Sequence, residues 1–316
     1  MIDFDKLLKV VVDQGASDLF ITAGLPPSIK VSGRIMPMSK TPLTPEQARE
    51  LVHSTMTEVQ VEEFESDHEC NYAIHSPVVG RFRVSAFYQR NQAGMVLRRI
   101  ETHIPSCDDL SLPEIVKQLA MSKRGLIIFV GATGTGKSTS LAAMIGHRNA
   151  NSKGHIITIE DPIEFIHEHR GCMVTQREVG VDTPSFDVAL KNTLRQAPDV
   201  IMIGEIRSAE TMEYAVTFAE TGHLCLATLH ANNANQALDR IINFFPADRH
   251  AQVWMDLSLN LKGMVAQQLI ETPDGKGRRA AIEIMLNTPL VSDLIRKGEV
   301  HTLKEVMRKS NELGMQ

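Results

Sequence analysis

The sequence predicts an α/β protein with two domains, a small α+β domain followed by a larger one with a mainly parallel sheet flanked by helices. Three observations support this prediction. Short strands and capped helices mix in the first hundred residues. After residue 114, apolar runs alternate with helical periodicity, which is typical of βαβ units. A loop of the pattern G-x-x-x-x-G-K-[ST] directly follows the apolar run 126–130, as at a strand-to-helix junction.

The first predicted domain covers residues 1–100 and opens with an amphipathic helix. Apolar residues between positions 4 and 12 recur at the spacing of one helix face, and Gly15 supplies a stop. Capping patterns that begin at Thr44 and Thr57 predict two further helices. Strands are predicted at 19–22, 29–31, 82–88 and 94–100.

A segment with two prolines and two aspartates, residues 101–113, predicts a linker to a second domain over 114–316. The strands of that domain are predicted near 125–130, 155–160, 199–203 and 223–229, and its helices near 137–148, 185–195, 208–220 and 234–243. Residues Gln252 to Gln268 are predicted to be largely helical. Asp274 to Gly277 is predicted as a hairpin turn between two strands, and helices are expected to close the chain.

Composition limits the possible functions. The chain has 316 residues, with 33 Lys and Arg against 38 Asp and Glu, so its net charge of −5 argues against general nucleic-acid binding. No apolar run approaches the ~20 residues of a membrane-spanning helix, and the N-terminus does not resemble a signal peptide, so we expect a cytoplasmic protein. Four dispersed cysteines predict buried free thiols, namely Cys70, Cys107, Cys172 and Cys225.

The loop at residues 131–138 predicts nucleotide binding. Its glycines let successive N–H groups turn inward around the β- and γ-phosphates, and the following helix presents its positive end to the same anion. We expect Lys137 to reach these phosphates and Ser138 to bind Mg²⁺. ATP is favoured over GTP because no guanine-reading N-K-x-D motif is present. The residues predicted to bind ATP here are Gly131, Ala132, Thr133, Gly134, Thr135, Gly136, Lys137, Ser138 and Thr139.

Two predicted strands end in carboxylates, which a hydrolysing site needs near the γ-phosphate. The first runs from His155 into Glu160, Asp161 and Glu164, and the second ends at Gly204 and Glu205. We interpret Glu205 as the residue of the Mg²⁺ shell and Glu164 as the base that activates water. The alternative is that these acids only cap helices or solvate loops.

Histidines frame the last predicted strand of this series. His223 and His230 stand at its opposite ends, so joint metal binding is not expected, but one or both could sense the γ-phosphate through hydrogen bonds. A hydrogen-bonded structural histidine is the alternative. His167 and His169 are expected on a solvated face.

Arginine is the third requirement of a phosphoryl-transfer site, because a guanidinium neutralises charge that develops in the transition state. Arg81, Arg83 and Arg98 alternate with apolar residues on the predicted strands of the first domain. They would act as arginine fingers if that domain covered the nucleotide of a neighbouring subunit. In a monomer they would form an exposed basic face, and the sequence leaves both interpretations open.

Together these segments resemble the twitching-motility ATPases of type IV pili, the PilT and PilU family of the secretion ATPase superfamily, and more specifically its PilU branch. The resemblance covers nearly the whole chain. The segments that carry it are 15–19 and 23–27 near the N-terminus, the Walker A loop 131–139, the Asp box 159–165, the atypical Walker B 204–207 and the His box 221–230.

The resemblance implies a PAS-like N-terminal domain, a RecA-like P-loop motor domain, and six subunits in a ring at the cytoplasmic base of the pilus machine. It places Glu164 on the catalytic glutamate and implies that Arg83 and Arg98 approach the neighbouring subunit's nucleotide. The implied partners are an inner-membrane pilus platform protein and a PilT-like ATPase.

The function that the resemblance implies is pilus retraction driven by ATP hydrolysis. Ser292 stands where the Ala-Ile-Arg motif of PilT-like chains has its arginine, and this favours an accessory motor of the PilU kind. The alternative, from another class, is a nucleotide-dependent structural adaptor with little intrinsic hydrolysis.

Overall fold

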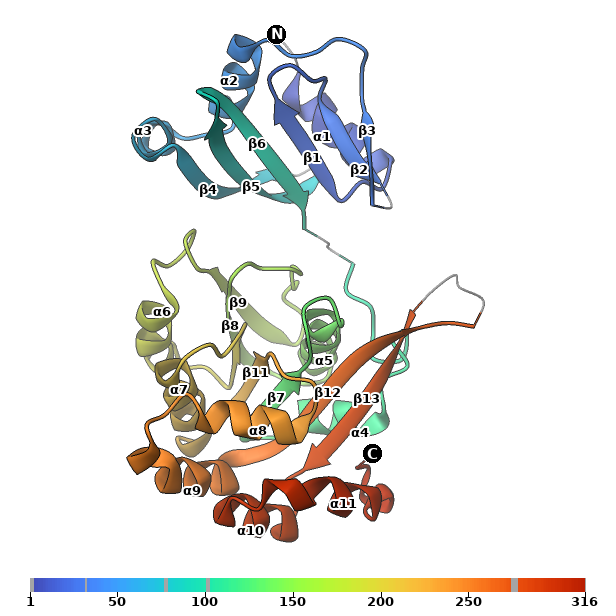
Figure 1. Cartoon of the computed structure of the whole chain (residues 1–316), viewed down its shortest axis with the longest axis vertical. Coiled ribbons are helices and arrows are strands. Elements are labelled where there is room, and N and C mark those ends of the chain that lie inside the picture. Colours follow the sequence, from blue (N-terminus) through green and yellow to red (C-terminus); the bar gives the residue numbers. More distant parts are fainter. Residues whose placement is uncertain (1–2, 32, 77–78, 101–102, 274–277, 316) are drawn as a thin grey trace. The chain divides into compact units, whose positions relative to one another are not determined.

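The computed structural model describes residues 3–31, 33–76, 79–100, 103–273 and 278–315. The chain divides into two compact units, Met1–Thr102 and His103–Gln316 (Figure 1). Each unit has its own sheet and its own apolar core. Within the described ranges, no helix is long and apolar enough to cross a membrane.

The first unit is built on a six-stranded antiparallel sheet in the order β3-β2-β1-β6-β5-β4. Its strands are β1 (Asp18–Thr22), β2 (Ser28–Val31), β3 (Arg34–Pro37), β4 (Glu69–Ser76), β5 (Gly80–Gln89) and β6 (Gln92–Arg99), and its helices are α1 (Phe4–Asp13), α2 (Pro45–His53) and α3 (Glu58–Asp67). The helices share one core with alternate strand residues such as Leu19, Val84 and Leu97. They therefore cover one face of the sheet.

Both predicted capping patterns are confirmed. The Thr44 side chain accepts the Gln47 backbone N–H at 3.2 Å, and the Gln47 side chain accepts the Thr44 backbone N–H at 3.0 Å. Thr57 and Gln60 repeat the arrangement at the start of α3. Each pair satisfies two N–H groups that a helix end would otherwise leave without partners.

The second unit contains a seven-stranded sheet in the order β13-β12-β7-β11-β10-β8-β9, in which only the β12–β13 pair is antiparallel. Its strands are β7 (Gly125–Val130), β8 (Gly154–Glu160), β9 (Cys172–Glu178), β10 (Val200–Ile203), β11 (Leu224–Leu229), β12 (Leu261–Glu271) and β13 (Arg278–Leu286). Its helices are α4 (Glu114–Ala120), α5 (Lys137–Asn151), α6 (Phe186–Thr193), α7 (Ala209–Glu220), α8 (Ala234–Ile242), α9 (His250–Asn260), α10 (Pro289–Lys297) and α11 (Leu303–Arg308), with 3₁₀ turns at Leu194–Gln196, Ala247–Arg249, Val300–Thr302 and Asn311–Leu313.

Helices cover both faces of this sheet. Ile127 and Phe129 of β7 belong to a core shared with α4 and α5. Leu126, Ile128 and Val130 belong to the opposite core, shared with α6 to α11. These five residues of β7 are all buried, as expected for a central parallel strand covered on both faces.

The helix predicted from Gln252 to Gln268 is wrong beyond Asn260. There α9 ends, and β12 begins at Leu261 and pairs in parallel with β7. An apolar run of this length fits a helix or a buried strand equally well, so its secondary structure depends on whether a neighbouring strand pairs with it. The hairpin turn predicted at residues 274–277 lies outside the described residues.

Three strands, β3, β4 and β9, were not predicted from the sequence, and each lies at an edge of its sheet. Edge strands pair on one side only and carry more exposed residues, so their apolar signal is weak; all four residues of β3 are exposed. In β4 the alternation was present, since Cys70 and Tyr72 are buried while Glu69 and Asn71 are exposed. The four cysteines are free and buried, as expected.

Phe129 offers a test of the second core, because it is fully buried in β7. We expect Phe129→Ala to lower the free energy of unfolding of the second unit by about 3 to 5 kcal/mol, since the lost ring leaves a cavity. Urea unfolding followed by the fluorescence of Trp254, the single tryptophan of the chain and part of α9, measures this change. The control Leu259→Ala, at a residue 71% exposed, should change stability by less than about 0.5 kcal/mol. Equal losses in both variants would contradict the assigned burial.

Candidate active site

Four neighbouring parallel strands of the second unit end at the same edge of the sheet. Their register pairs Val130 with Leu229, Ala227 with Ile203, and Ile203 with Ile159. The segments that follow these strands therefore lie along one edge, in the order 131–138, 230, 204–205 and 161–164. Carboxyl ends of parallel strands are where α/β sheets bind ligands. The structure thus brings together the glycine-rich loop, His230, Glu205 and the acidic segment.

The glycine-rich loop leads from β7 into α5, as predicted. Gly134 and Gly136 have φ values of +78° and +84°, in the left-handed region that favours glycine. Lys137 is the first residue of α5, and Ser138 and Thr139 follow in its first turn. Their backbone N–H groups lie at the positive end of the helix dipole, which attracts anions.

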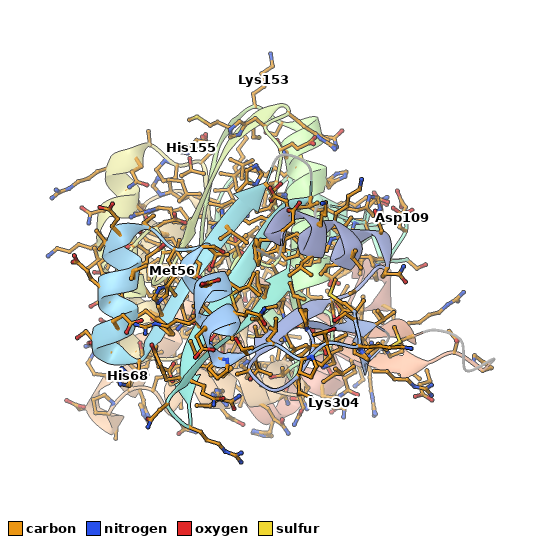
Figure 2. The ribbon with its side chains drawn as sticks, turned by 90° about the horizontal axis from the view of Figure 1, so that it is seen from above. Met56, His68, Asp109, Lys153, His155 and Lys304 are labelled. Atoms are coloured by element: carbon orange, nitrogen blue, oxygen red, sulfur yellow. The ribbon has the colours of Figure 1, made fainter. Side chains whose placement is uncertain are left out.

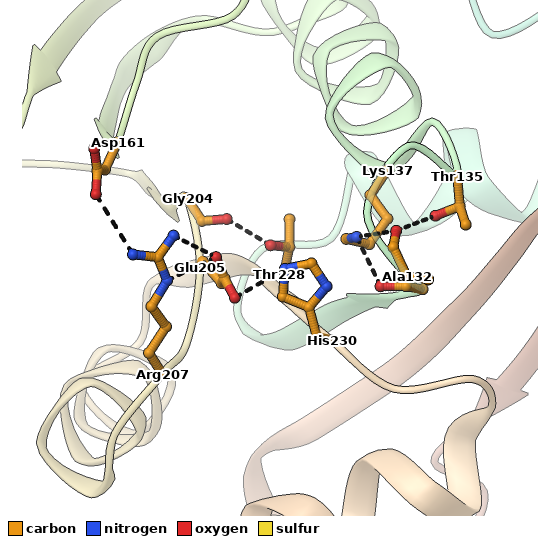
Figure 3. A network of polar contacts seen from close by, with 10 residues as sticks. Ala132, Thr135, Lys137, Asp161, Gly204, Glu205, Arg207, Thr228 and His230 are labelled. Atoms are coloured by element: carbon orange, nitrogen blue, oxygen red, sulfur yellow. Dashed lines mark hydrogen bonds and ion pairs between the residues drawn. The ribbon is translucent and has the colours of Figure 1, made fainter.

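The Lys137 ammonium is directed at the start of its own loop (Figure 3). Its Nζ donates to the carbonyl oxygens of Gly131 at 2.7 Å and Ala132 at 2.8 Å. Burial lowers the pKa of this ammonium, and the charge of Glu205 opposes the shift. A cation held by neutral carbonyls can exchange them for an anion, because attraction between opposite charges adds to the hydrogen bond.

Glu205, just beyond β10, is the centre of a charged network (Figure 3). Its Oε2 accepts from Arg207 Nε at 2.8 Å and Arg207 Nη2 at 2.7 Å, and its Oε1 lies 3.0 Å from His230 Nε2. Arg207 Nη1 also lies 3.5 Å from Asp161 Oδ2. The hydrogen bond to Glu205 raises the pKa of the Arg207 guanidinium. The network connects the ends of β8, β10 and β11.

Two glutamates at the end of β8 have different surroundings. Glu164 is exposed, whereas Glu160 is buried. Glu160 Oε1 accepts from Thr158 Oγ1 at 2.6 Å and from Gln176 Nε2 at 3.1 Å. Burial outweighs these hydrogen bonds and raises the pKa of Glu160 to about 7. Glu164 is therefore the carboxylate that solvent water can reach.

His223 and His230 lie at opposite ends of β11, as predicted from the sequence. His230 follows Leu229 at the loop edge, but His223 precedes Leu224, which pairs with Gly125 at the start of β7. The six residues of β11 separate the two histidines, a span of about 20 Å at the usual rise of a strand. His223 Nδ1 lies 3.0 Å from Thr221 Oγ1. Within the second unit, His223 is therefore not part of the loop edge.

The expectation of a solvated face at His167 and His169 is wrong for His167. That residue is buried, and burial lowers its pKa to about 4. His169 is exposed, and its Nδ1 accepts the Val174 backbone N–H at 3.1 Å. Both histidines lie farther along the segment between β8 and β9 than Glu164.

Arg83 and Arg98 belong to the first unit, where they are direct cross-strand neighbours on β5 and β6. Asp18 on β1 pairs with Arg98, and its Oδ1 lies 2.9 Å from Arg98 Nε. Asp18 is buried while Arg98 is exposed. A buried carboxylate thus orients one of two adjacent cations, and the three residues together keep a positive charge. Arg81 lies two residues before Arg83, on the same face of β5. A role for these arginines at a neighbour's nucleotide stays a prediction.

Arg207 and Asp161 were not predicted as site residues from the sequence. Asp161 lies in the Asp box 159–165, and Arg207 lies in the atypical Walker B 204–207. The sequence signal for Arg207 was its position two residues after Glu205, the acid that follows a predicted strand. Gln267, which contacts the loop from β12, was missed because its segment was predicted to be helical.

A parallel sheet with helices on both faces, with a phosphate loop and strand-end carboxylates at one edge, defines a RecA-like P-loop ATPase. Comparisons agree with this class. Residues 2–284 match the type II/IV secretion system protein family. The chain is 74% identical to the type IV pilus ATPase PilU of Pseudomonas aeruginosa over 314 residues, which cover 99% of this chain and 82% of that protein.

Two further similarities involve PilT. The type IV pilus retraction ATPase PilT of Pseudomonas aeruginosa is 43% identical over 314 residues, covering 99% of this chain and 91% of that protein. A crystal structure of the pilus retraction motor PilT with bound ADP matches with a TM-score of 0.93 at 40% identity, covering 98% of this chain and 90% of the other. The chain belongs to the type II/IV secretion system family, in its PilT and PilU group, and is a nucleotide-binding ATP hydrolase. The family resemblance and the fold class are thereby confirmed.

Glu160 makes the stability of the second unit depend on pH. Its pKa is about 7 in the folded chain against an ordinary value of 4.5. Between these values the folded chain holds the proton and the unfolded chain does not, so stability falls as pH rises through this window. As pH rises from about 5 to about 8, we expect the free energy of unfolding of Glu160→Gln to increase by on the order of 2 to 3 kcal/mol relative to that of the natural chain.

Urea unfolding at several pH values, followed by Trp254 fluorescence, measures this difference. The matched control is Glu210→Gln, at an exposed position on α7, for which we expect no comparable pH dependence. Parallel pH profiles for Glu160→Gln and the natural chain would show that Glu160 is not a buried acid.

Proposed function

We propose that this chain is one subunit of a hexameric ATPase motor that couples ATP hydrolysis to type IV pilus retraction, acting beside a PilT-like ATPase. The observation that carries the proposal is the convergence of the phosphate loop, His230, Glu205 and the Glu164 segment at one sheet edge. The pilus role is supported by the similar proteins, which are named type IV pilus ATPase PilU and retraction ATPase PilT.

In this proposal the loop and Lys137 hold the phosphates of ATP. The Lys137 ammonium exchanges its contacts with Gly131 and Ala132 for phosphate oxygens. Mg²⁺ fits the donors present, because it prefers oxygen ligands and takes one or two from protein, with water and phosphate supplying the rest. Ser138 would bind it directly. Glu205 would act through water, since Arg207 and His230 already engage both of its oxygens.

Glu164 is proposed as the base that orients and deprotonates the attacking water, because its exposed carboxylate follows β8 at the loop edge. His230 is proposed to donate a hydrogen bond to the γ-phosphate. Its contact with Glu205 holds the ring at 3.0 Å from that carboxylate. Mg²⁺, when bound, neutralises charge on the transferring phosphoryl group.

Arg83 and Arg98 are proposed to complete the site of a neighbouring subunit. A guanidinium at the transferring phosphoryl group is worth ~10³ to 10⁵ in rate. The proposed domains are the PAS-like residues 1–100, the linker 101–113 and the RecA-like motor 114–316. Because each site would need two subunits, a closed ring of six gives every site its arginines.

We propose that the ring docks on the inner-membrane platform protein of the pilus, on the cytoplasmic side. Ser292 supports an accessory role. Its hydroxyl donates a hydrogen bond to the Ser258 carbonyl oxygen at 2.7 Å and so connects α10 to α9. An arginine in the Ala-Ile-Arg motif of PilT-like chains would present a cation here. Retraction is therefore proposed to need the PilT-like partner.

The hydrolytic roles predict that Lys137→Ala and Glu164→Gln each lower ATP turnover by at least about 100-fold, since one removes a phosphate contact and the other the base. Phosphate release measures turnover. The matched control is Glu168→Gln, an exposed acid in the same segment, which should stay within about twofold. Natural rates in both variants would refute the assigned site. A natural chain that binds ATP but turns over no faster than Glu164→Gln would favour the structural adaptor.

The proposed shared site predicts complementation between two inactive variants. A double variant with Arg83→Ala and Arg98→Ala keeps its own loop, and Glu164→Gln keeps its arginines. Mixed one to one, random rings should regain up to about a quarter of the natural turnover, because one interface in four then has both intact halves. Size-exclusion chromatography with light scattering confirms ring formation. Mixtures as inactive as either variant alone would argue against arginines supplied by a neighbour.

A further inference from the structure

A buried glutamine joins the phosphate loop to the helix that follows it. Gln267, on β12, is 2% exposed. Its Nε2 donates to the carbonyl oxygen of Thr135 at 2.8 Å, and its Oε1 accepts from Ser140 Oγ at 2.8 Å. Thr135 belongs to the loop and Ser140 to α5. The amide therefore connects both parts of the phosphate site to the sheet.

The contact with Thr135 determines how the amide lies. A carbonyl oxygen only accepts hydrogen bonds, so the amide nitrogen of Gln267 must face Thr135. The Ser140 hydroxyl then donates to the amide oxygen. Both ends of a buried amide are thereby satisfied, which makes the arrangement rigid as well as specific.

This contact also sets the direction of one loop N–H group. The carbonyl of Thr135 and the N–H of Gly136 belong to one peptide plane, and in a trans peptide they point in opposite directions. Because Gln267 holds the Thr135 oxygen toward β12, the Gly136 N–H points away from the strand. N–H groups on that open side are those that can cradle a phosphate.

Two glycines of the loop approach Gln267 closely. A Cβ atom added at Gly131 would lie 2.7 Å from the main-chain oxygen of Gln267, and one at Gly136 would lie 2.7 Å from its Nε2. Real Cβ atoms do not come this close, and Gly136 also has a φ of +84°, in the left-handed region, so glycine is favoured at both positions. The loop is therefore shaped to fit against Gln267.

We propose that Gln267 is a positioning residue for nucleotide binding: it directs the Gly136 N–H at a phosphate of ATP without touching the nucleotide. The inference rests on the assignment of the loop to the ATP phosphates. It adds a residue from β12, outside the Walker A, Asp box, Walker B and His box segments, to those on which nucleotide affinity depends.

The test compares the affinity for a fluorescent ADP analogue, measured by titration of the full chain. Gln267→Met keeps the length of the side chain and removes the amide, so the dissociation constant should rise about tenfold, as expected when one charge-assisted hydrogen bond to phosphate is lost. Ser140→Ala removes only the second contact and should raise it by no more than about threefold. Gln268→Met alters the exposed neighbour and should leave it within about twofold.

Unfolding midpoints without nucleotide separate positioning from stability. We expect Gln267→Met to bind weakly while its midpoint stays within about 5 °C of the natural chain. A lowered midpoint with unchanged affinity would overturn the inference, as would equal affinity losses in Gln267→Met and Gln268→Met. If Gln267→Met does not fold, Gln267→Glu keeps the shape and removes the donor to Thr135, and natural affinity in that variant would overturn the inference equally.

Lys137→Ala distinguishes failure of the inference from failure of the assigned site. Loss of binding in Lys137→Ala with natural affinity in Gln267→Met would retain the nucleotide site and reject the role of Gln267. Natural affinity in Lys137→Ala would reject the site itself, and the proposed function with it.

Discussion

The parallel pairing of β7, β11, β10 and β8 is the constraint on which the rest of the structure depends. Main-chain hydrogen bonds align Val130 with Leu229 and Ile203 with both Ala227 and Ile159, so four loops that are distant in the sequence leave the sheet side by side. A slip of one residue would move a strand end by about 3.3 Å. That shift would break the contacts of 2.7 to 3.0 Å that hold Glu205 to Arg207 and His230.

Three polar side chains that are buried near this edge have hydrogen-bond partners. Lys137 is held by two loop carbonyls, Glu160 by Thr158 and Gln176, and Gln267 by Thr135 and Ser140. Burying such groups without partners would be costly, and with partners it makes them rigid. Preorganised dipoles stabilise developing charge without reorganising during the reaction, which is what phosphoryl transfer requires of a protein.

Much of the fold followed from local patterns. The capped starts of α2 and α3, the strand–loop–helix unit around the phosphate loop, and the acid-ended strands β8 and β10 were predicted because each depends on neighbours within a few residues. The segment from Leu261 onward could not be predicted, because an apolar run suits a helix or a strand until a partner strand selects one. Gln267 was missed for the same reason, since its contacts are with residues more than 120 positions earlier.

The sequence by itself determined the chemistry that acts at short range: glycines where the loop backbone turns left-handed, a lysine at the first position of α5, threonines that cap helices, and carboxylates that follow apolar strands. Only the tertiary structure decided which of those groups meet. It brought His230 within 3.0 Å of Glu205, and it buried Glu160 while exposing Glu164. The physical reason is that backbone sterics and capping act within one turn or strand, whereas register and burial depend on which distant segments pair.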